Sequence, residues 1–548
     1  MVARAMAREC AARAALLAAL CWTQLSGAAE APRIVERDGR HALFVDGAPY
    51  LVLGAQINNS SAWPAALPKV WPAVEQMRAN TVVAPIAWEQ IEPQEGRFDF
   101  SFLEMMLDQA RARGLRVALL WFGAWKNNAP NYAPEWVKLD NKRFPRVVTA
   151  SGAVLNSLSP HAPATLEADR RAFAALMRHL KRIDEQRTVI LVQVQNEPGT
   201  YGSVRDYSPA AERLFRAEAP AALLKRFKKS AGRWEQAFGA DAEEFFHAWS
   251  IARFIEQVAA AGKAEYPLPM YVNAALRDPF NPGKPGGYAS GGPTDNVLDI
   301  YRTAAPSIDV IAPDIYMRES TRYFRVLELY SRPDNPLFVS ETGNDKAYAR
   351  YVFAVLGRGA IGFVPFGIDY TGYANYPLGA KQADEAMVEP FGAVYRLLPA
   401  PLARKWAQLS FEGEVWGAAQ PDDSADQQLD LGRWSARVSY NEWQFGMKDW
   451  TWAGKLDAPD GREIPDGGAL IARLGPDEYL VTGRNARVSF GLGKGRQAHG
   501  VLFARVEEGR YDDRGRWIFE RVWNGDQTDY GLNFTTLPQL LRVRLATY

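Results

Sequence analysis

Short apolar segments alternate with amphipathic segments along the first two thirds of the chain. Residues 67–78 have helical spacing, with Val70, Val74 and Met77 on one face, and residues 173–180 repeat that spacing. The apolar segments between such helices are strand-like, and they are 50–55, 81–85, 116–122, 190–195, 270–273, 308–317, 337–341 and 361–366. Eight strand-then-helix units predict an α/β fold in which a parallel sheet closes into a (β/α)8 TIM barrel.

The pattern differs at both ends of this region. Residues 34–53 read as a hairpin with Asp-Gly turns, and we expect it to belong to a barrel domain spanning 30–405. From about residue 410 the sequence becomes polar and rich in turns between short alternating strands, without helical periodicity. We therefore predict an all-β, jelly-roll-like accessory domain at 406–548. Such a domain stabilises the barrel, binds sugar or walls the active site.

The first 29 residues have the composition of a secretory signal peptide. Arginines come first, an apolar run at 14–22 follows, and small residues lie at 26–29. The run is too short for a permanent membrane span. The two cysteines, Cys10 and Cys21, both lie in this segment, so its removal leaves a mature chain with neither disulfides nor thiol chemistry. We expect an exported protein, periplasmic or secreted.

Charge and histidine content exclude several classes of partner. The chain has 64 basic and 63 acidic residues, a net charge of +1, which argues against nucleic acid or an anionic membrane. Its five histidines are scattered without paired ligand spacing, and no glycine-rich loop for phosphate precedes a helix. We therefore expect neither a metal nor a cofactor.

Two strands end in a glutamate followed by a glycine-containing turn. Glu197 lies in I-L-V-Q-V-Q-N-E-P-G, and Glu341 lies in P-L-F-V-S-E-T-G-N. The carboxyl ends of strands four and seven face each other across a barrel mouth, so the two carboxyls can approach to about 5 Å, the separation of retaining glycosidases. Asn-Glu-Pro alone is a weak signal, but a second glutamate at the predicted strand end strengthens it. Glu197 suits the general acid, Glu341 suits the nucleophile, and Asn196 can donate to the sugar 2-hydroxyl.

Several stretches together resemble a known enzyme family. They are D-G-A-P-Y-L-V-L-G-A in the hairpin, W-E-Q-I-E-P-Q-E-G-R-F-D-F from Trp88, V-Q-V-Q-N-E-P-G and V-S-E-T-G-N. The chain resembles glycoside hydrolase family 35, the retaining β-galactosidases, and within it a bacterial branch with a β-rich C-terminal domain. The resemblance implies that Glu197 is the acid/base and Glu341 the nucleophile. It also implies that Tyr316, at the end of strand six, hydrogen-bonds Glu341, as in many related glycosidases; the alternative is a tyrosine of the core.

The chain departs from this family where galactose is usually gripped. Better-known members have Ala-Glu-Trp after strand three, whereas this chain has Ala-Trp followed by Lys126 and Asn127, which we expect as substitutes. They also have tyrosine before the second-strand tryptophan, where this chain has Pro85. Trp88 is either a sugar platform or part of the core. Further candidate substrate contacts, chosen by their place at strand ends, are Asn58 and Asn273.

These expectations converge on a retaining exo-β-galactosidase acting on oligosaccharides, with xyloglucan fragments as the first substrate to try, because the bacterial branch is associated with them. Another glycosidase of the same clan, such as a β-mannosidase or an endo-glucanase, is the alternative enzyme. The alternative outside enzymes is a non-catalytic sugar-binding protein whose glutamates only hold hydroxyls.

Overall fold

The computed structural model describes residues 30–443, 445–448 and 463–548. The expected signal peptide at 1–29, with both cysteines, lies outside the described residues. Within the described ranges, no helix is both long and apolar enough to cross a bilayer.

Eight parallel strands close into a barrel in the described chain, so the predicted (β/α)8 fold is confirmed. Each strand pairs with its neighbour around the ring, and β10 closes the circle against β9. In chain order the strands are β4 (Val52–Gln56), β5 (Thr81–Ala87), β6 (Arg116–Lys126), β9 (Val189–Asn196), β10 (Met270–Ala275), β11 (Val310–Ile315), β12 (Phe338–Thr342) and β13 (Gly362–Pro365).

The barrel strands are apolar on both faces because both faces are covered. Successive residues point to opposite sides of a strand, so Val82 packs outward against helices while Val83 packs into the barrel interior. The longer helices around the barrel are α2 (Leu67–Gln76), α4 (Ser101–Arg111), α6 (Pro163–Ile183), α10 (Ala242–Glu265), α12 (Ser320–Tyr330) and α15 (Glu385–Tyr395). Shorter helices are α3 (Trp88–Ile91), α5 (Glu135–Lys138), α11 (Leu298–Ala304), α13 (Lys346–Ala349) and α14 (Tyr351–Leu356).

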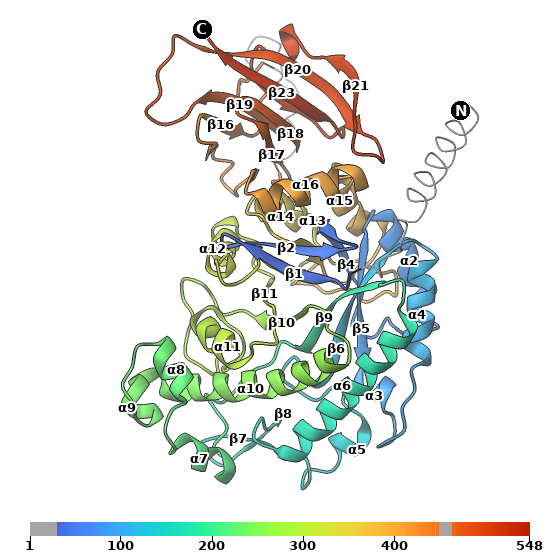
Figure 1. The fold of residues 1–548 in the computed structure, drawn as a ribbon, viewed down its shortest axis with the longest axis vertical. Helices are drawn as coiled ribbons and strands as arrows, with labels where there is room; N and C mark the ends of the chain where they lie inside the picture. The colour runs from blue at the N-terminus through green and yellow to red at the C-terminus, as the bar shows by residue number, and fades with distance from the viewer. Residues whose placement is uncertain (1–29, 444, 449–462) are drawn as a thin grey trace, which may run out of the picture.

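A small antiparallel sheet closes the amino-terminal end of the barrel. It consists of β1 (Arg33–Arg37), β2 (Arg40–Val45) and β3 (Ala48–Tyr50), and it lies in front of the barrel in Figure 1. Leu43 and Val45 of β2 join the interior cluster that contains Val52 and Val83. The opposite end, at the carboxyl ends of the strands, stays open to a substrate. A second small sheet pairs β7 (Arg146–Val148) with β8 (Val154–Leu158).

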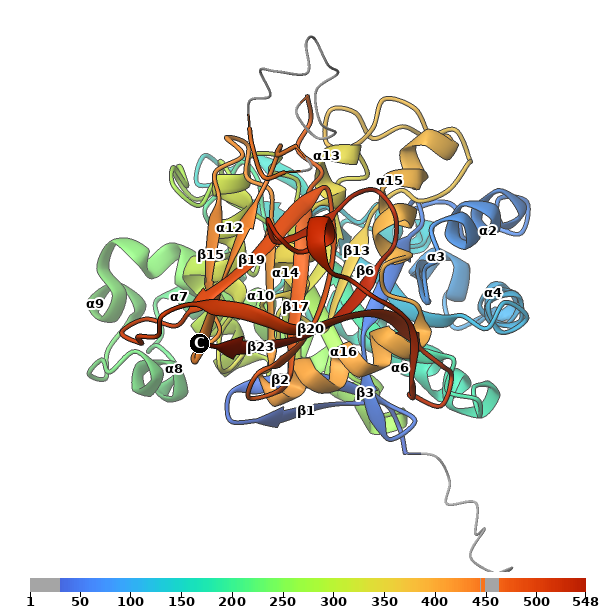
Figure 2. The ribbon, with the colours of Figure 1, turned by 90° about the horizontal axis from the view of Figure 1, so that it is seen from above.

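The C-terminal region is β-rich, as predicted, and forms two antiparallel sheets around one core (Figures 1 and 2). The six-stranded sheet contains β14 (Val415–Ala419), β17 (Gly468–Gly475), β18 (Glu478–Arg484), β23 (Leu540–Thr547), β20 (Val501–Tyr511) and β21 (Trp517–Val522). The four-stranded sheet contains β15 (Gln427–Asp430), β16 (Trp434–Ser439), β19 (Ala486–Leu492) and β22 (Leu532–Phe534). The predicted boundary between residues 405 and 406 falls within α16 (Ala400–Glu412), before the first of these strands. Jelly-roll connectivity stays a prediction.

The β-rich region packs directly on the outer helices of the barrel. A Cβ on Gly417 of β14 would lie 2.1 Å from the carbonyl oxygen of Phe353 in α14, so only glycine permits this approach. The buried guanidinium of Arg350 donates to the Gln420 carbonyl at 2.8 Å and to Asp422 at 2.5 Å. Apolar residues of both regions belong to one continuous core cluster. The two regions therefore support each other.

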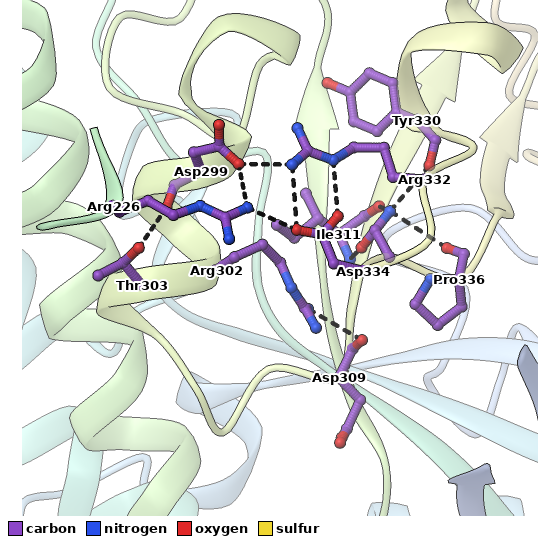
Figure 3. Close-up of polar contacts among 11 residues, drawn as sticks. Arg226, Asp299, Arg302, Thr303, Asp309, Ile311, Tyr330, Arg332, Asp334 and Pro336 are labelled. Carbon is purple, nitrogen blue, oxygen red and sulfur yellow. Dashed lines mark hydrogen bonds and ion pairs between the residues drawn. The ribbon is translucent and has the colours of Figure 1, made fainter. Parts of the chain in front are cut away.

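The segment between β9 and β10 carries the extra helices α7 (Pro209–Phe215), α8 (Ala221–Arg226) and α9 (Trp234–Phe238). An ionic cluster fastens it to the barrel (Figure 3). Arg226 at the end of α8 donates to Asp299 of α11 at 2.6 Å and to Asp334 at 2.8 Å. Arg332 binds the same two carboxylates. This part of the chain follows β9 and therefore begins directly after the strand that leads into Glu197.

Candidate active site

A cavity of about 560 Å³ opens at the carboxyl ends of the barrel strands. Glu197 and Glu341 both line it, together with Tyr316, Lys126 and Asn127. The other lining residues are Asn58, Asn59, Ser60, Ser61, Ala66, Tyr132, Phe366, Thr371, Tyr373, Asn375 and Leu378. Six of the nine predicted site residues thus line one cavity, and two glutamates far apart in the sequence share its wall.

Glu197 follows β9 in an unusual backbone conformation. Its φ of 44° lies in the left-handed region, which a residue with a side chain adopts only when its surroundings hold it there. Two amides do so. The Glu197 N–H donates to Asn273 Oδ1 at 2.9 Å, and the Asn128 side chain donates to the Glu197 carbonyl at 2.8 Å. The backbone kink and its two anchors aim the carboxyl into the cavity.

Glu341 lies on regular strand β12 and is held by its side chain instead. Tyr316 donates its hydroxyl to Oε1, and Gln56 Nε2 donates to Oε2 at 3.1 Å. Burial and the Glu341 charge raise the pKa of Tyr316 well above its ordinary value, so the phenol keeps its proton. Both carboxylate oxygens therefore face donors, and this fixes the orientation of the carboxylate.

The environment of Glu197 favours its protonated form. Burial raises the pKa of Glu197 to about 7, and the negative charge of Glu341 adds to the increase. The charge of Lys126 and a hydrogen bond with Asp314 oppose that increase. A carboxylic acid that still carries its proton near neutral pH beside an oriented carboxylate is the pairing that glycoside cleavage uses.

Lys126 lies at the end of β6, in register with Asn196, and is 4% exposed. Its ammonium group donates to Asn127 Oδ1. In the described part of the chain, no carboxylate oxygen lies within 4.0 Å of it, the range of the ion pairs found elsewhere in the molecule. Lys126 thus acts on Glu197 through its charge and leaves its remaining donors directed at the cavity region.

The predicted asparagines have different surroundings. Asn58 is clamped by Asp369, which accepts from its backbone N–H at 2.8 Å and from its side-chain amide at 3.0 Å. Its own Oδ1 has no partner among the described residues, and it lines the cavity. Asn196 is fully buried, and neither atom of its amide group finds a partner within the described ranges. Buried amides without partners are rare, so these atoms have hydrogen-bonding capacity left for a ligand.

Asn273 positions other residues rather than contacting the cavity. It is fully buried on β10, accepts the Glu197 N–H, and donates to Asp314 Oδ2 at 2.6 Å. The expected substrate contact is therefore corrected to a supporting role, because both ends of its amide are already used.

Of the two alternatives for Trp88, sugar platform or core, the structure supports the core. It is fully buried, packs against Trp121 and Trp136, and donates its indole N–H to Glu92 at 3.0 Å. Glu92 in turn accepts from Gly96 N and from Arg171. The stretch that begins at Trp88 is a self-contained structural network, and no ring face of Trp88 is free for a sugar.

Sequence reasoning missed Asp314, Gln56 and Asp369. Asp314 is 3% exposed, pairs in register with Glu341 and contacts the Glu197 carboxyl. A signal was present, since an aspartate inside the apolar strand V-I-A-P-D-I is costly to bury without a purpose. Gln56 and Asp369 offered no such signal, because their partners lie far away in the sequence. Within the described residues, no group of three or more His, Cys, Asp or Glu is arranged to hold a metal ion.

Part of the chain matches a family of glycoside hydrolases. Residues 63–248, which include Glu197 and Lys126, match a family model described as Beta-galactosidase, that of glycoside hydrolase family 42. This match supports a glycoside hydrolase. The family differs from family 35, so that narrower assignment stays a prediction. Residues 391–535 match a domain of unknown function, DUF5597, and no curated protein matches the chain.

Solved structures with a similar fold include three glycosidases. The β-galactosidase of the psychrophilic Marinomonas ef1 is 14% identical with a TM-score of 0.47, over 66% of this chain and 62% of that one. The β-galactosidase of Bacillus circulans sp. alkalophilus is 10% identical with a TM-score of 0.48, over 90% and 99%. The exo-β-1,4-mannosidase of Opitutaceae bacterium strain TAV5 is 16% identical with a TM-score of 0.40, over 69% and 63%. The chain spans less than two thirds of the Marinomonas enzyme, and values this low support no conclusion on activity.

Proposed function

We propose that the protein is a retaining exo-β-galactosidase that removes terminal non-reducing β-D-galactose from oligosaccharides. The observation that carries the proposal is the pair Glu197 and Glu341, which line one cavity in opposite electrostatic surroundings. The β-galactosidase family match over residues 63–248 supports the choice of sugar.

In the first step Glu341 attacks the anomeric carbon while Glu197 gives its proton to the leaving glycosidic oxygen. The glycosidic bond breaks, and an ester bond forms between Glu341 and galactose. Glu197 is then a carboxylate. In the second step it takes a proton from water, whose oxygen bonds to the anomeric carbon as the ester breaks. Two inversions at one carbon retain its configuration.

Asn196 supplies the contact that strengthens between ground state and transition state. Its unpaired amide, next to Glu197, suits the 2-hydroxyl of the sugar, where positive charge develops nearby. Lys126, Asn127 and Asn58 remain the proposed contacts to the other hydroxyls, since all three line the cavity.

Cleavage from the chain end is favoured by the shape of the cavity. The segment after β13 contributes Thr371, Tyr373, Asn375 and Leu378 to the cavity wall. A polysaccharide that extended past the cavity on this side would meet that wall, so a chain end fits the site better than an internal unit. Tyr373, which lines the cavity, is 60% exposed, and its sequence neighbour Tyr376 is 59% exposed. Aromatic faces there can support further sugar units, which fits a branched plant oligosaccharide such as a xyloglucan fragment.

A panel of nitrophenyl glycosides tests the proposal. We expect release from the β-galactoside and much slower release from the β-mannoside and β-glucoside. No release from the β-galactoside would contradict it, and preference for the β-mannoside or for internal bonds of a glucan would favour the alternative glycosidases. If tight sugar binding occurs without turnover, the chain is a non-catalytic sugar-binding protein.

We also propose export, on the composition of residues 1–29. Sequencing the amino terminus of the protein recovered from the periplasm or medium should give a chain that starts near residue 30. Recovery from the cytoplasm with residues 1–29 intact would contradict export.

A further inference from the structure

The site holds a third carboxyl that the two-glutamate mechanism does not use. Asp314, near the end of β11, lies behind the cavity wall, between the strands that carry Glu197 and Glu341. Its Oδ2 accepts from Asn273 at 2.6 Å, and its Oδ1 accepts from Ser340 Oγ at 3.0 Å. Asn273 is also the residue that holds the backbone of Glu197. Through Asn273, Asp314 is therefore built into the support of Glu197, and it lies in register with Glu341 on the neighbouring strand.

The Asp314 side chain is hydrogen-bonded to the Glu197 carboxyl. An ionised carboxylate has only acceptors, so two carboxyl groups share a hydrogen bond only when one of them carries a proton. Glu197 has to part with its proton in the first step of the proposed reaction. If Asp314 were ionised at that moment, two adjacent anions would remain in a buried site.

We propose that Asp314 is a positioning residue that keeps its own proton throughout the reaction and donates a hydrogen bond to ionised Glu197. The inference rests on the proposed function of the same site. It assigns Asp314 a role other than substrate contact, because it is 3% exposed and does not line the cavity.

The charges around Asp314 agree with a neutral group there. The charged groups that face it are Glu197, Glu341 and Lys126. With Asp314 protonated, the negative Glu341 is balanced by Lys126 before the reaction, and the negative Glu197 is balanced by Lys126 in the ester stage. An ionised Asp314 would leave an extra buried negative charge in both stages.

The other titratable groups facing Asp314 are phenols that stay neutral. They are Tyr271 on β10, Tyr316 after β11 and Tyr330 on α12. Burial raises the pKa of each phenol well above its ordinary value. Burial, followed by the charges of Glu341 and Glu197, raises the pKa of Asp314 well above its ordinary value too. Both oxygens can still accept hydrogen bonds, because a protonated carboxyl keeps acceptor capacity.

The first test is the pH dependence of kcat/KM for nitrophenyl β-galactoside in Asp314→Asn. Asparagine keeps the shape, can accept from Asn273 and can donate to Glu197. We expect the alkaline limb to move by less than about half a pH unit, because a neutral donor replaces a neutral donor. A downward move of more than about one unit would overturn the proposal, because it would show that a negative charge had been removed beside Glu197.

Two further variants separate hydrogen bonding from structure. Asp314→Ala removes the donor to ionised Glu197, so the alkaline limb should move to higher pH, and Asp314→Asn should restore it. Ser340→Ala removes a neighbour of Asp314 that does not contact Glu197, so the limb should stay in place. Loss of activity in Asp314→Ala and Asp314→Asn alike, with an unchanged pH profile, would indicate a merely structural residue and overturn the proposal.

The second test does not depend on turnover. Infrared spectra of the full chain with isotope-labelled aspartate should show a protonated carboxyl stretch at pH 7 that disappears in Asp314→Asn. If Asp314→Asn does not fold, the band should shift in Ser340→Ala. A spectrum without the band overturns the inference even if the galactosidase assay succeeds. A band in a protein that hydrolyses no galactoside supports the buried proton while the proposed function fails.

Discussion

The two glutamates of the site are held in place by different means. Glu197 has a kinked backbone with a φ of 44°, fixed by side chains that bind its N–H and its carbonyl. Glu341 lies on a regular strand, and donors hold its carboxylate oxygens instead. The comparison shows two different surroundings in one barrel mouth: burial raises the pKa of Glu197 to about 7, whereas two donors fix the orientation of the Glu341 carboxylate. The burial of Glu197 suits the proposed acid, and the two donors to Glu341 suit the proposed nucleophile.

The largest expected effect comes from removing Glu341, the proposed nucleophile. Glu341→Gly should lower kcat by more than about 10⁴-fold, because the covalent step loses its nucleophile. Azide should restore turnover by attacking from the vacated side, giving the α-galactosyl azide. Glu244→Gln, at another buried glutamate, is the matched control and should keep activity. A β-configured azide product would assign the two glutamates the other way round.

Replacing Glu197, the proposed acid, should lower the rate less than replacing Glu341, and the size of the loss should depend on the leaving group of the substrate. Glu197→Gln should slow cleavage of a natural disaccharide by about 10²–10⁴-fold, the usual contribution of general acid catalysis. Dinitrophenyl galactoside needs no protonation to depart, so its first step should be nearly unaffected and a burst should appear. Equal losses on both substrates would argue against Glu197 as the acid.

The next largest loss of activity is expected when a hydrogen-bond donor to Glu341 is removed. Tyr316→Phe removes a hydrogen bond to a charged group, worth about 1.5–3 kcal/mol, so kcat/KM should fall about 10- to 100-fold. Tyr271→Phe is the control, because the Tyr271 hydroxyl is buried and has no hydrogen-bond partner among the described residues. Similar losses in both variants would mean that the effect comes from packing.

The barrel and the positions of its two glutamates could be predicted from the sequence. Apolar runs placed the strands, and the barrel rule then placed Glu197 and Glu341 at the same open end. The Tyr316 hydrogen bond to Glu341 was expected from the family resemblance and is present. The other anchors could not be predicted in the same way, because Gln56 and Asn273 reach the glutamates from strands distant in the sequence. A positive φ at Glu197 has no local signature, since glycine does not stand there.

The errors have physical causes as well. Trp88 and Asn273 stand near strand ends, where ligand contacts are common, but the polar atoms of each are used by protein partners. A tryptophan followed four residues later by a glutamate that accepts its indole N–H forms a local network, which sequence spacing alone cannot distinguish from a sugar platform.

The smallest effect should come from Lys126, which acts on Glu197 through its charge. Because the lysine charge opposes the rise in the Glu197 pKa from burial, Lys126→Met should raise that pKa further above about 7. Activity is lost as pH rises and Glu197 loses its proton, so the alkaline limb of kcat/KM should move to higher pH, by up to about one unit. Lys126→Arg keeps the charge and should leave the limb in place. A move to lower pH in Lys126→Met would contradict this account.

The most direct test of the account is to trap the galactosyl-enzyme ester. Incubation with an activated 2-deoxy-2-fluoro-β-galactoside should add one fluorogalactosyl group, and mass spectrometry of the digested protein should find it on Glu341 within P-L-F-V-S-E-T-G-N. A label on any other residue, or hydrolysis of galactosides with no trapped ester, would contradict the assignment of Glu341 as nucleophile.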